Sequence, residues 1–130
     1  MFDRIEVAAG IVKNAEGRYL ICRRKGSLEG LWEFPGGKRE KGETFQQCLE
    51  RELMEELELP VSAGDTLGSV LRQEDGRTIW LFFVSAEVSG EVPLKLHVHG
   101  DAAWVTPAEM DQYTFCPADQ AFLSRRPFDE

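Results

Sequence analysis

Apolar and polar residues follow two different spacings along the chain, and each spacing predicts a type of element. Continuous or alternating runs of apolar, β-branched residues are typical of strands. The first two runs, residues 5–12 and 18–24, flank the polar turn 14–17 and predict a hairpin. The most apolar run, residues 78–88, predicts a central strand of a sheet. Shorter runs predict three more strands, at residues 66–72, 94–98 and 103–105.

A helical spacing begins at Thr44. Thr44 and Gln47 have the form of a capping box, in which two side chains pair with backbone N–H groups that the first helical turn leaves unpaired. Pro60 ends the helix, because proline cannot continue the backbone hydrogen bonding. The apolar face of this helix is predicted to consist of Leu49, Leu53 and Leu57.

Two shorter helices are expected toward the carboxyl end. Thr106, Pro107 and Glu109 combine a capping box with a proline in the first turn, which predicts a short helix. A second helix is expected over residues 117–125. The residues expected to pack inward from it are Ala118, Ala121 and Phe122.

The helix that begins at Thr44 also carries a cluster of acidic residues. Glu52, Glu55 and Glu56 lie at i, i+3 and i+4, where like charges on an exposed helix repel by about 0.2–0.5 kcal/mol per pair. Clustered carboxylate oxygens suit a hard cation such as Mg²⁺, which binds a few carboxylates together with phosphates and water. Glu is also a good helix former, and charged runs are often only solvated. The pattern therefore predicts either a metal site or a solvent-facing helix.

The stretch from Gly37 to Leu59 resembles the Nudix box. Gly37 is followed after five residues by Glu43, and after seven more residues by the run RELMEELEL at residues 51–59. The chain fits every defined position except one, because the family usually has Gly where this chain has Glu58. By this resemblance, residues 1–130 are identified as one Nudix hydrolase domain with its box at residues 37–59.

The resemblance implies hydrolysis of a diphosphate linked to another group, with Mg²⁺ as the cofactor and Mn²⁺ as a substitute. Arg51 is expected to orient the acidic cluster, with Glu43 as its hydrogen-bond acceptor. The metal would neutralise phosphate charge and lower the pKa of a water molecule, and Glu52 is the expected base for that water. The expected metal ligands are Glu52, Glu55, Glu56 and the backbone carbonyl of Gly37.

The same resemblance implies an α/β fold of the Nudix type. In this fold a mixed sheet lies between the box helix and the carboxy-terminal helix, as an α/β/α sandwich. The order of predicted strands and helices agrees with this arrangement.

Three residues outside the catalytic cluster are candidates for substrate binding, and each has a second interpretation. Arg24 lies in a basic run and matches a nucleotide-contacting position of the MutT-like branch; otherwise it belongs to a solvated loop. Phe34 precedes the box and is either the wall of a base pocket or part of the core. Asp119 matches a position where Asn or Asp of that branch binds the base; otherwise it is a first-turn acid favoured by the helix dipole.

The chain departs from the family at a second place. Many relatives have Glu and then His before a Trp-Val strand, and that Glu acts as a further metal ligand or base, whereas here the pair is Val98 and His99. The role of the missing acid is therefore absent, taken by Asp101 or left to Glu52. His97 and His99 are less favoured as metal ligands, because a hard cation prefers oxygen.

Composition and charge narrow the range of partners. The chain has 130 residues, of which 42% are hydrophobic and 29% charged, enough for one domain with a core. A net charge of -8 disfavours DNA or RNA as a stable partner, but a small nucleotide bound with a metal stays compatible. The three cysteines fit no disulfide framework and are expected as thiols. Without a signal peptide or membrane span, a cytoplasmic monomer or homodimer is expected.

These expectations lead to a nucleoside triphosphate pyrophosphohydrolase of the MutT type. Such an enzyme would release a nucleoside monophosphate and pyrophosphate, and it would remove oxidised or non-standard nucleotides before they enter DNA, which is a form of DNA repair. One alternative changes the substrate to a dinucleoside polyphosphate or a nucleotide sugar. The other alternative is a nucleotide-binding module without turnover, which the intact acidic set opposes. Asp119 leaves oxidised guanine, cytosine and adenine-like bases open.

Overall fold

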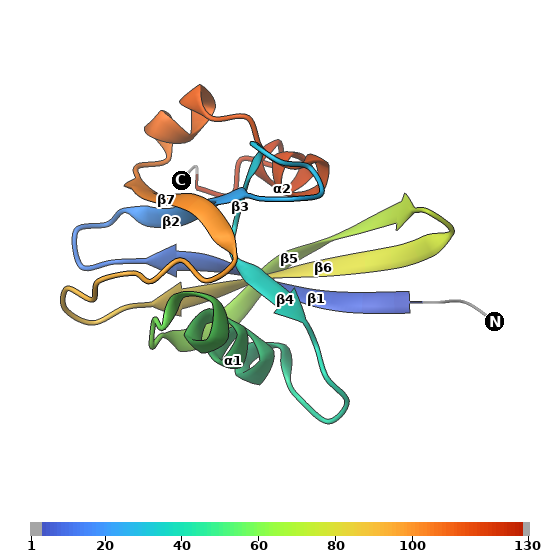
Figure 1. Ribbon diagram of the computed structural model, residues 1–130, viewed down its shortest axis with the longest axis horizontal. Helices are drawn as coiled ribbons and strands as arrows, with labels where there is room; N and C mark the ends of the chain where they lie inside the picture. Colours follow the sequence, from blue (N-terminus) through green and yellow to red (C-terminus); the bar gives the residue numbers. More distant parts are fainter. Residues whose placement is uncertain (1–3, 129–130) are drawn as a thin grey trace.

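The computed structural model describes residues 4–128 as a mixed seven-stranded sheet with helix α1 on one face and helix α2 on the other (Figure 1). This arrangement confirms the predicted α/β fold. In chain order the elements are β1 (Arg4–Lys13), β2 (Tyr19–Arg24), β3 (Trp32–Glu33), β4 (Gly36–Lys38), α1 (Phe45–Leu57), β5 (Ser62–Glu74), β6 (Arg77–Glu87), β7 (His99–Val105), the 3₁₀ helix η1 (Ala108–Gln112) and α2 (Pro117–Leu123).

Strand β1 lies in the middle of the sheet, and the sheet divides along one of its edges. On one side β1 runs parallel to β6 along its whole length, and β5 follows β6 in antiparallel orientation. On the other side, β4 pairs with β1 around Val7 to Ala9, whereas β2 pairs with it only at Lys13. Strands β3 and β7 both pair with β2. The sheet therefore opens between β4 and the β2, β3 and β7 group.

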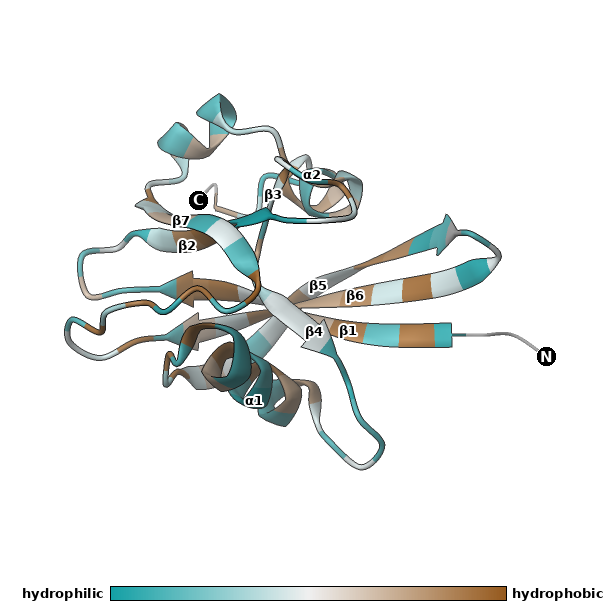
Figure 2. Ribbon diagram, viewed as in Figure 1, coloured by the Kyte–Doolittle hydropathy of each residue, from teal (hydrophilic) through white to brown (hydrophobic). Residues whose placement is uncertain are grey.

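Each face of the sheet has its own hydrophobic core. Figure 2 shows hydrophobic and hydrophilic residues alternating only near the start of β1, while the rest of the strand is mainly apolar, as expected for a strand covered on both faces. Phe83 of β6 stacks on Phe122 of α2, with ring centroids 4.1 Å apart. The preceding residue, Phe82, stacks on Phe45 of α1, also at 4.1 Å. The predicted leucine face of α1 is fully buried, at Leu49, Leu53 and Leu57.

Helix α1 begins with the predicted capping box and ends at a residue in an unusual conformation. The Thr44 hydroxyl accepts from the Gln47 N–H at 3.0 Å, and the Gln47 side chain accepts from the Thr44 N–H at 2.9 Å. Glu58 is left-handed, with φ 51° and ψ 40°, a conformation that costs a residue with a Cβ about 1–2 kcal/mol. Its N–H donates to the Met54 carbonyl at 3.1 Å. Glu58 thus makes the turn for which the box usually has Gly.

The prediction of a strand at residues 94–98 was wrong. The segment is irregular, and strand β7 begins only at His99. The Lys95 N–H donates to the carbonyl of Leu57, and the His97 N–H donates to the carbonyl of Glu56, both at 3.1 Å. These backbone donors pair with the end of α1 and not with a neighbouring strand.

Gly36 and Gly37 belong to strand β4, which packs closely against β1. A Cβ on Gly36 would overlap the carbonyl oxygen of Ala8 in β1, so the close approach of the two strands requires glycine there. Neither Gly36 nor Gly37 has a positive φ. The need for glycine therefore comes from close packing.

Helix α2 is shorter than predicted and differs in its inward face. It ends at Leu123, and Ala121 is exposed, so the prediction that Ala121 packs inward was wrong. Ala118 and Phe122 are buried as predicted, together with Asp119. Ala118 and Asp119 lie four and three positions before Phe122, which is the spacing of one helix face.

Two further predictions concern the cysteines and membrane-spanning helices. The cysteines Cys22, Cys48 and Cys116 are buried free thiols, as predicted. Between residues 4 and 128, no helix is long and apolar enough to cross a membrane.

A pair of neighbouring substitutions on α1 tests this packing. Leu53→Ala should lower the free energy of unfolding by about 2–5 kcal/mol, because Leu53 is fully buried and its removal leaves a cavity. Met54→Ala should change it by no more than about 0.5 kcal/mol, because Met54 is exposed on the same helix. Urea unfolding of both variants measures the difference. Equal losses would contradict the assigned helix face.

Candidate active site

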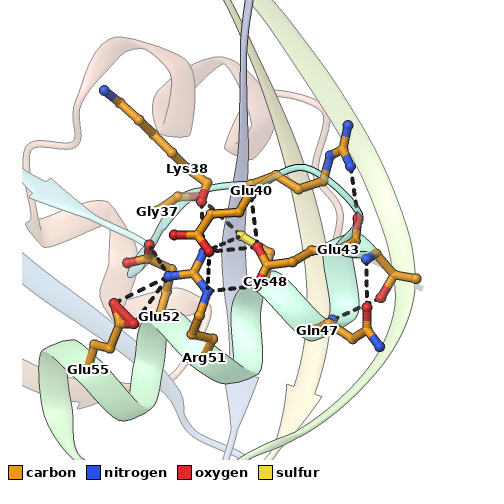
Figure 3. Close-up of polar contacts among 11 residues, drawn as sticks. Gly37, Lys38, Glu40, Glu43, Gln47, Cys48, Arg51, Glu52 and Glu55 are labelled. Carbon is orange, nitrogen blue, oxygen red and sulfur yellow. Dashed lines mark hydrogen bonds and ion pairs between the residues drawn. The ribbon is translucent and has the colours of Figure 1, made fainter.

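The guanidinium of Arg51 lies at the centre of the acidic cluster of α1 (Figure 3). Its Nε and Nη2 donate to the two carboxylate oxygens of Glu43, at 2.6 and 2.9 Å. Its Nη1 donates to Glu52 at 3.0 Å and to Glu55 at 3.3 Å. Nη2 also donates to the backbone carbonyl of Lys38 at 3.0 Å. One side chain thus joins β4, the loop before α1 and the helix itself.

The charges of Arg51 and Glu43 stabilise each other. The hydrogen bond from Arg51, followed by one from the Glu40 N–H, lowers the pKa of Glu43 to about 2. The hydrogen bond to Glu43 is also the main cause that raises the pKa of Arg51 above its ordinary value. Both oxygens of Glu43 are occupied by Arg51, so Glu43 is placed to hold Arg51 and not to take up a proton.

Glu52 and Glu56 face the backbone of β4 and each other. A Cβ on Gly37 would overlap the Glu52 carboxylate, so this carboxylate lies directly against the main chain at Gly37. Burial raises the pKa of Glu56 well above its ordinary value, and a hydrogen bond with Glu52 and the charges of Glu52, Glu33 and Glu55 raise it further. Glu56 Oε1 is buried and has no hydrogen-bond partner among residues 4–128. The cluster therefore has an excess of negative charge and an unsatisfied oxygen.

This donor set fits a hard divalent cation. Within the described part of the chain, no three His, Cys, Asp or Glu side chains already form a cage for an ion, and Arg51 contacts two of the carboxylates concerned. Mg²⁺ does not need a full protein cage, because it keeps several waters and is completed by substrate phosphates. The buried free oxygen of Glu56 and the carboxylate of Glu52 beside Gly37 are the donors that such an ion prefers.

Glu33, which was not predicted from the sequence, connects Arg24 with His99. Its Oε1 accepts from Arg24 Nη1 at 2.8 Å, and its Oε2 lies 2.9 Å from His99 Nε2. Its charge also raises the pKa of Glu56, so Glu33 lies near the acidic cluster. The available signal was a charged residue between Trp32 and Phe34, directly before the box.

The residues near the position of the family's missing glutamate have different surroundings in the structure. Val98 and Asp101 are exposed, and the Asp101 carboxylate accepts the N–H of Ala102. His99 is only 4% exposed, and its Nδ1 has no partner among the residues that the structure describes. His97 lies outside this group and contacts Glu58 at 2.6 Å.

A cavity of about 360 Å³ lies where the sheet divides, next to the acidic cluster. Arg24 lines it, whereas its neighbour Arg23 turns toward β7 and donates to the Gly100 carbonyl at 3.2 Å. Phe34 also lines it and stacks on Phe115 at 5.5 Å, so this residue serves both the core and the wall. The sequence analysis did not single out the two arginines that line the cavity from β5 and β6, Arg72 and Arg77.

Asp119 also lines this cavity, and only 3% of its surface is exposed. Its Oδ1 accepts the N–H of Phe34 at 2.9 Å. Burial raises the pKa of Asp119 to about 7, and the charge of Glu33 adds to this, although the Phe34 N–H opposes it. Near neutral pH the side chain can therefore both accept and donate hydrogen bonds.

The raised pKa of Asp119 predicts a pH-dependent gain from Asp119→Asn. An acid that titrates at about 7 when folded and 3.8 when unfolded binds its proton more tightly in the folded state, so stability falls as pH rises between these values. The variant should be more stable than the unaltered protein by on the order of 2–4 kcal/mol at pH 8, with little difference at pH 4. Urea unfolding at both pH values measures this. Exposed Asp111→Asn is the control, and an equal difference at both pH values would contradict the assignment.

Comparisons with known proteins agree with this geometry. The family model described as the NUDIX domain matches residues 3–126. The CTP pyrophosphohydrolase of Escherichia coli is 37% identical over 133 residues, which cover 94% of this chain and 93% of that protein. The 8-oxo-dGTP diphosphatase of Haemophilus influenzae is 32% identical over 127 residues, which cover 93% of this chain and 90% of that protein.

A solved structure supports the fold independently. The crystal structure of the MutT protein from Methanosarcina mazei matches with a TM-score of 0.85, over 99% of this chain and 98% of that chain. At 22% identity this likeness bears on the fold. The family model and the two relatives show that the chain belongs to the Nudix hydrolase family, in its MutT-like branch, and the solved structure agrees with the fold.

Proposed function

We propose that this protein hydrolyses nucleoside triphosphates to a nucleoside monophosphate and pyrophosphate, with Mg²⁺ as the cofactor. Its substrates would be oxidised or other non-standard nucleotides of the cytoplasmic pool. The observation that supports this most is the continuity of the cavity with the acidic cluster. Asp119 and Phe34 line the same cavity as Gly37 and Lys38, and the Glu52 carboxylate lies against Gly37. A nucleotide could therefore place its base and its phosphates in one continuous space.

The acidic cluster supplies the groups for phosphate chemistry. Bound Mg²⁺ would neutralise phosphate charge and lower the pKa of an attacking water. Glu52, Glu55, Glu56 and the Gly37 carbonyl are the residues proposed to hold it. Glu52 is the proposed base, because its carboxylate lies against Gly37 at the border of the cavity. Arg51 and Glu43 hold this carboxylate in place.

The cavity supplies the groups for nucleotide recognition. Arg24 is the proposed contact for the polar part of the nucleotide, and Glu33 orients its guanidinium. Phe34 is the proposed wall of the base pocket, and Asp119 the proposed base-reading group. An ionised Asp119 accepts from an exocyclic amine, whereas the protonated form donates to a base oxygen. The two relatives are named for nucleotides with different bases, CTP and 8-oxo-dGTP, so a substrate panel is needed to identify the base.

A substrate panel tests the proposal directly. Pyrophosphate and phosphate release should be measured with Mg²⁺, with Mn²⁺ and with EDTA. The panel would contain normal and oxidised nucleoside triphosphates, a diadenosine polyphosphate and ADP-ribose. We expect pyrophosphate as the product, a preference for one triphosphate, and no turnover with EDTA. Turnover of only the last two substrates would replace the proposed substrate class, and turnover of none would favour a nucleotide-binding module.

Glu52→Gln tests the proposed base. It should lower kcat by about 10²–10⁴-fold, because the amide cannot accept the proton, while the melting temperature stays close to that of the unaltered protein. Glu50→Gln is the matched control on the same helix. Glu50 accepts the Ala63 N–H at 3.0 Å, which an amide oxygen can also do, so its kcat should not change. Full activity of Glu52→Gln would show that another group acts as the base.

A further inference from the structure

An irregular segment of the chain covers the carboxyl end of the catalytic helix. A helix end leaves backbone carbonyls without partners inside the helix. Here the Lys95 N–H donates to the carbonyl of Leu57, and the His97 N–H donates to the carbonyl of Glu56, each at 3.1 Å. One of the proposed metal ligands, Glu56, thus has its backbone held by a segment about 40 residues further along the chain.

Side chains of the same segment converge on Glu58. His97 Nε2 lies 2.6 Å from Glu58 Oε2, and Lys95 Nζ lies 3.6 Å from Glu58 Oε1. The last turn of α1 contains no basic residue, although cations there would be favoured by the helix dipole. Lys95 supplies a positive charge from outside the helix, and His97 adds a hydrogen bond to the same carboxylate.

The conformation of Glu58 points to the use of its side chain. A glycine would make the left-handed turn without strain, but it would have no carboxylate to contact the segment. All three side chains are about half exposed or more, and exposed ion pairs contribute little to global stability. Their effect is therefore expected on the position of the segment and less on the unfolding of the protein.

The segment continues directly into the active site. Two residues after His97, strand β7 begins at His99, which is buried and contacts Glu33 at 2.9 Å. The contacts from Glu58 through residues 95–97 therefore connect the end of α1, with Glu56, to the start of β7, with His99. If this segment loosened, the Glu56 carbonyl would lose its contact with the His97 N–H, and the chain leading into His99 would be held less firmly.

On the basis of the proposed metal site, we propose that Glu58 is a positioning residue of this enzyme. Its carboxylate holds residues 95–97 across the end of α1 and thereby fixes Glu56 for metal binding.

Glu58→Gly separates this role from the ending of the helix, because glycine keeps the left-handed turn and removes only the carboxylate. The melting temperature should be equal or higher. Amide hydrogen exchange at Lys95 and His97, measured by NMR, should be at least about tenfold faster. Binding of Mn²⁺ to the protein without nucleotide, measured by EPR, should weaken by about tenfold, the lower end of the range typical of residues that support metal ligands.

Asp75→Gly is the matched control. Asp75 is a second left-handed, exposed residue, with φ 48°, in the turn between β5 and β6 and outside the residues that line the cavity. The substitution relieves the same type of strain, but exchange at Lys95 and His97 and the affinity for Mn²⁺ should not change. His97→Ala should reproduce the effect of Glu58→Gly, and the two together should give less than the product of the single effects.

Unchanged exchange at these two amides and unchanged Mn²⁺ affinity in Glu58→Gly would overturn the proposal and leave Glu58 as a helix end only. Both measurements are independent of turnover. If the unaltered protein bound Mn²⁺ but hydrolysed no triphosphate, the proposed function would fail, and the role of Glu58 would still be decided by exchange and Mn²⁺ binding.

Discussion

The bidentate pair of Arg51 and Glu43 is the interaction on which the arrangement of the site depends. Several carboxylates on one helix face repel one another, and a single guanidinium between them offsets this repulsion while its remaining donor reaches the backbone of β4. Because the hydrogen bond from Arg51 lowers the pKa of Glu43 to about 2, the carboxylate stays ionised at neutral pH. The loop before α1, the helix and β4 are thus held as one unit.

Close packing of β4 gives this unit its second constraint. Side chains on Gly36 and Gly37 would overlap β1 on one side and the Glu52 carboxylate on the other. The main chain is therefore held between the central strand and the acidic helix. This arrangement brings the Glu52 carboxylate against the main chain at Gly37, and carboxylate and carbonyl oxygens are the donors that hard cations prefer.

The division of the sheet beside β1 relates the acidic cluster to the cavity. Where β4 separates from β2 and β3, the space is lined by residues from six strands, β1 to β6, and from α2. Glu33 lies at this junction and contacts Arg24 and His99 through its two oxygens. The fold thus places a charged connection between Arg24, which lines the cavity, and His99 at the start of β7.

The sequence by itself determined the elements whose signals are local. These signals depend on residues a few positions apart, and the structure contains each of the elements that they predict. They are the capping box at Thr44, the leucine spacing of α1, the box carboxylates and the apolar run of the interior strand β6. Tertiary structure alone decided features that depend on distant partners. The donors of residues 94–98 pair with α1 and form no strand, Asp119 is buried by its contact with Phe34, and Arg72 and Arg77 reach the cavity from remote strands. The physical reason is that hydrogen-bond partners and burial are set by chain segments that the local pattern does not contain.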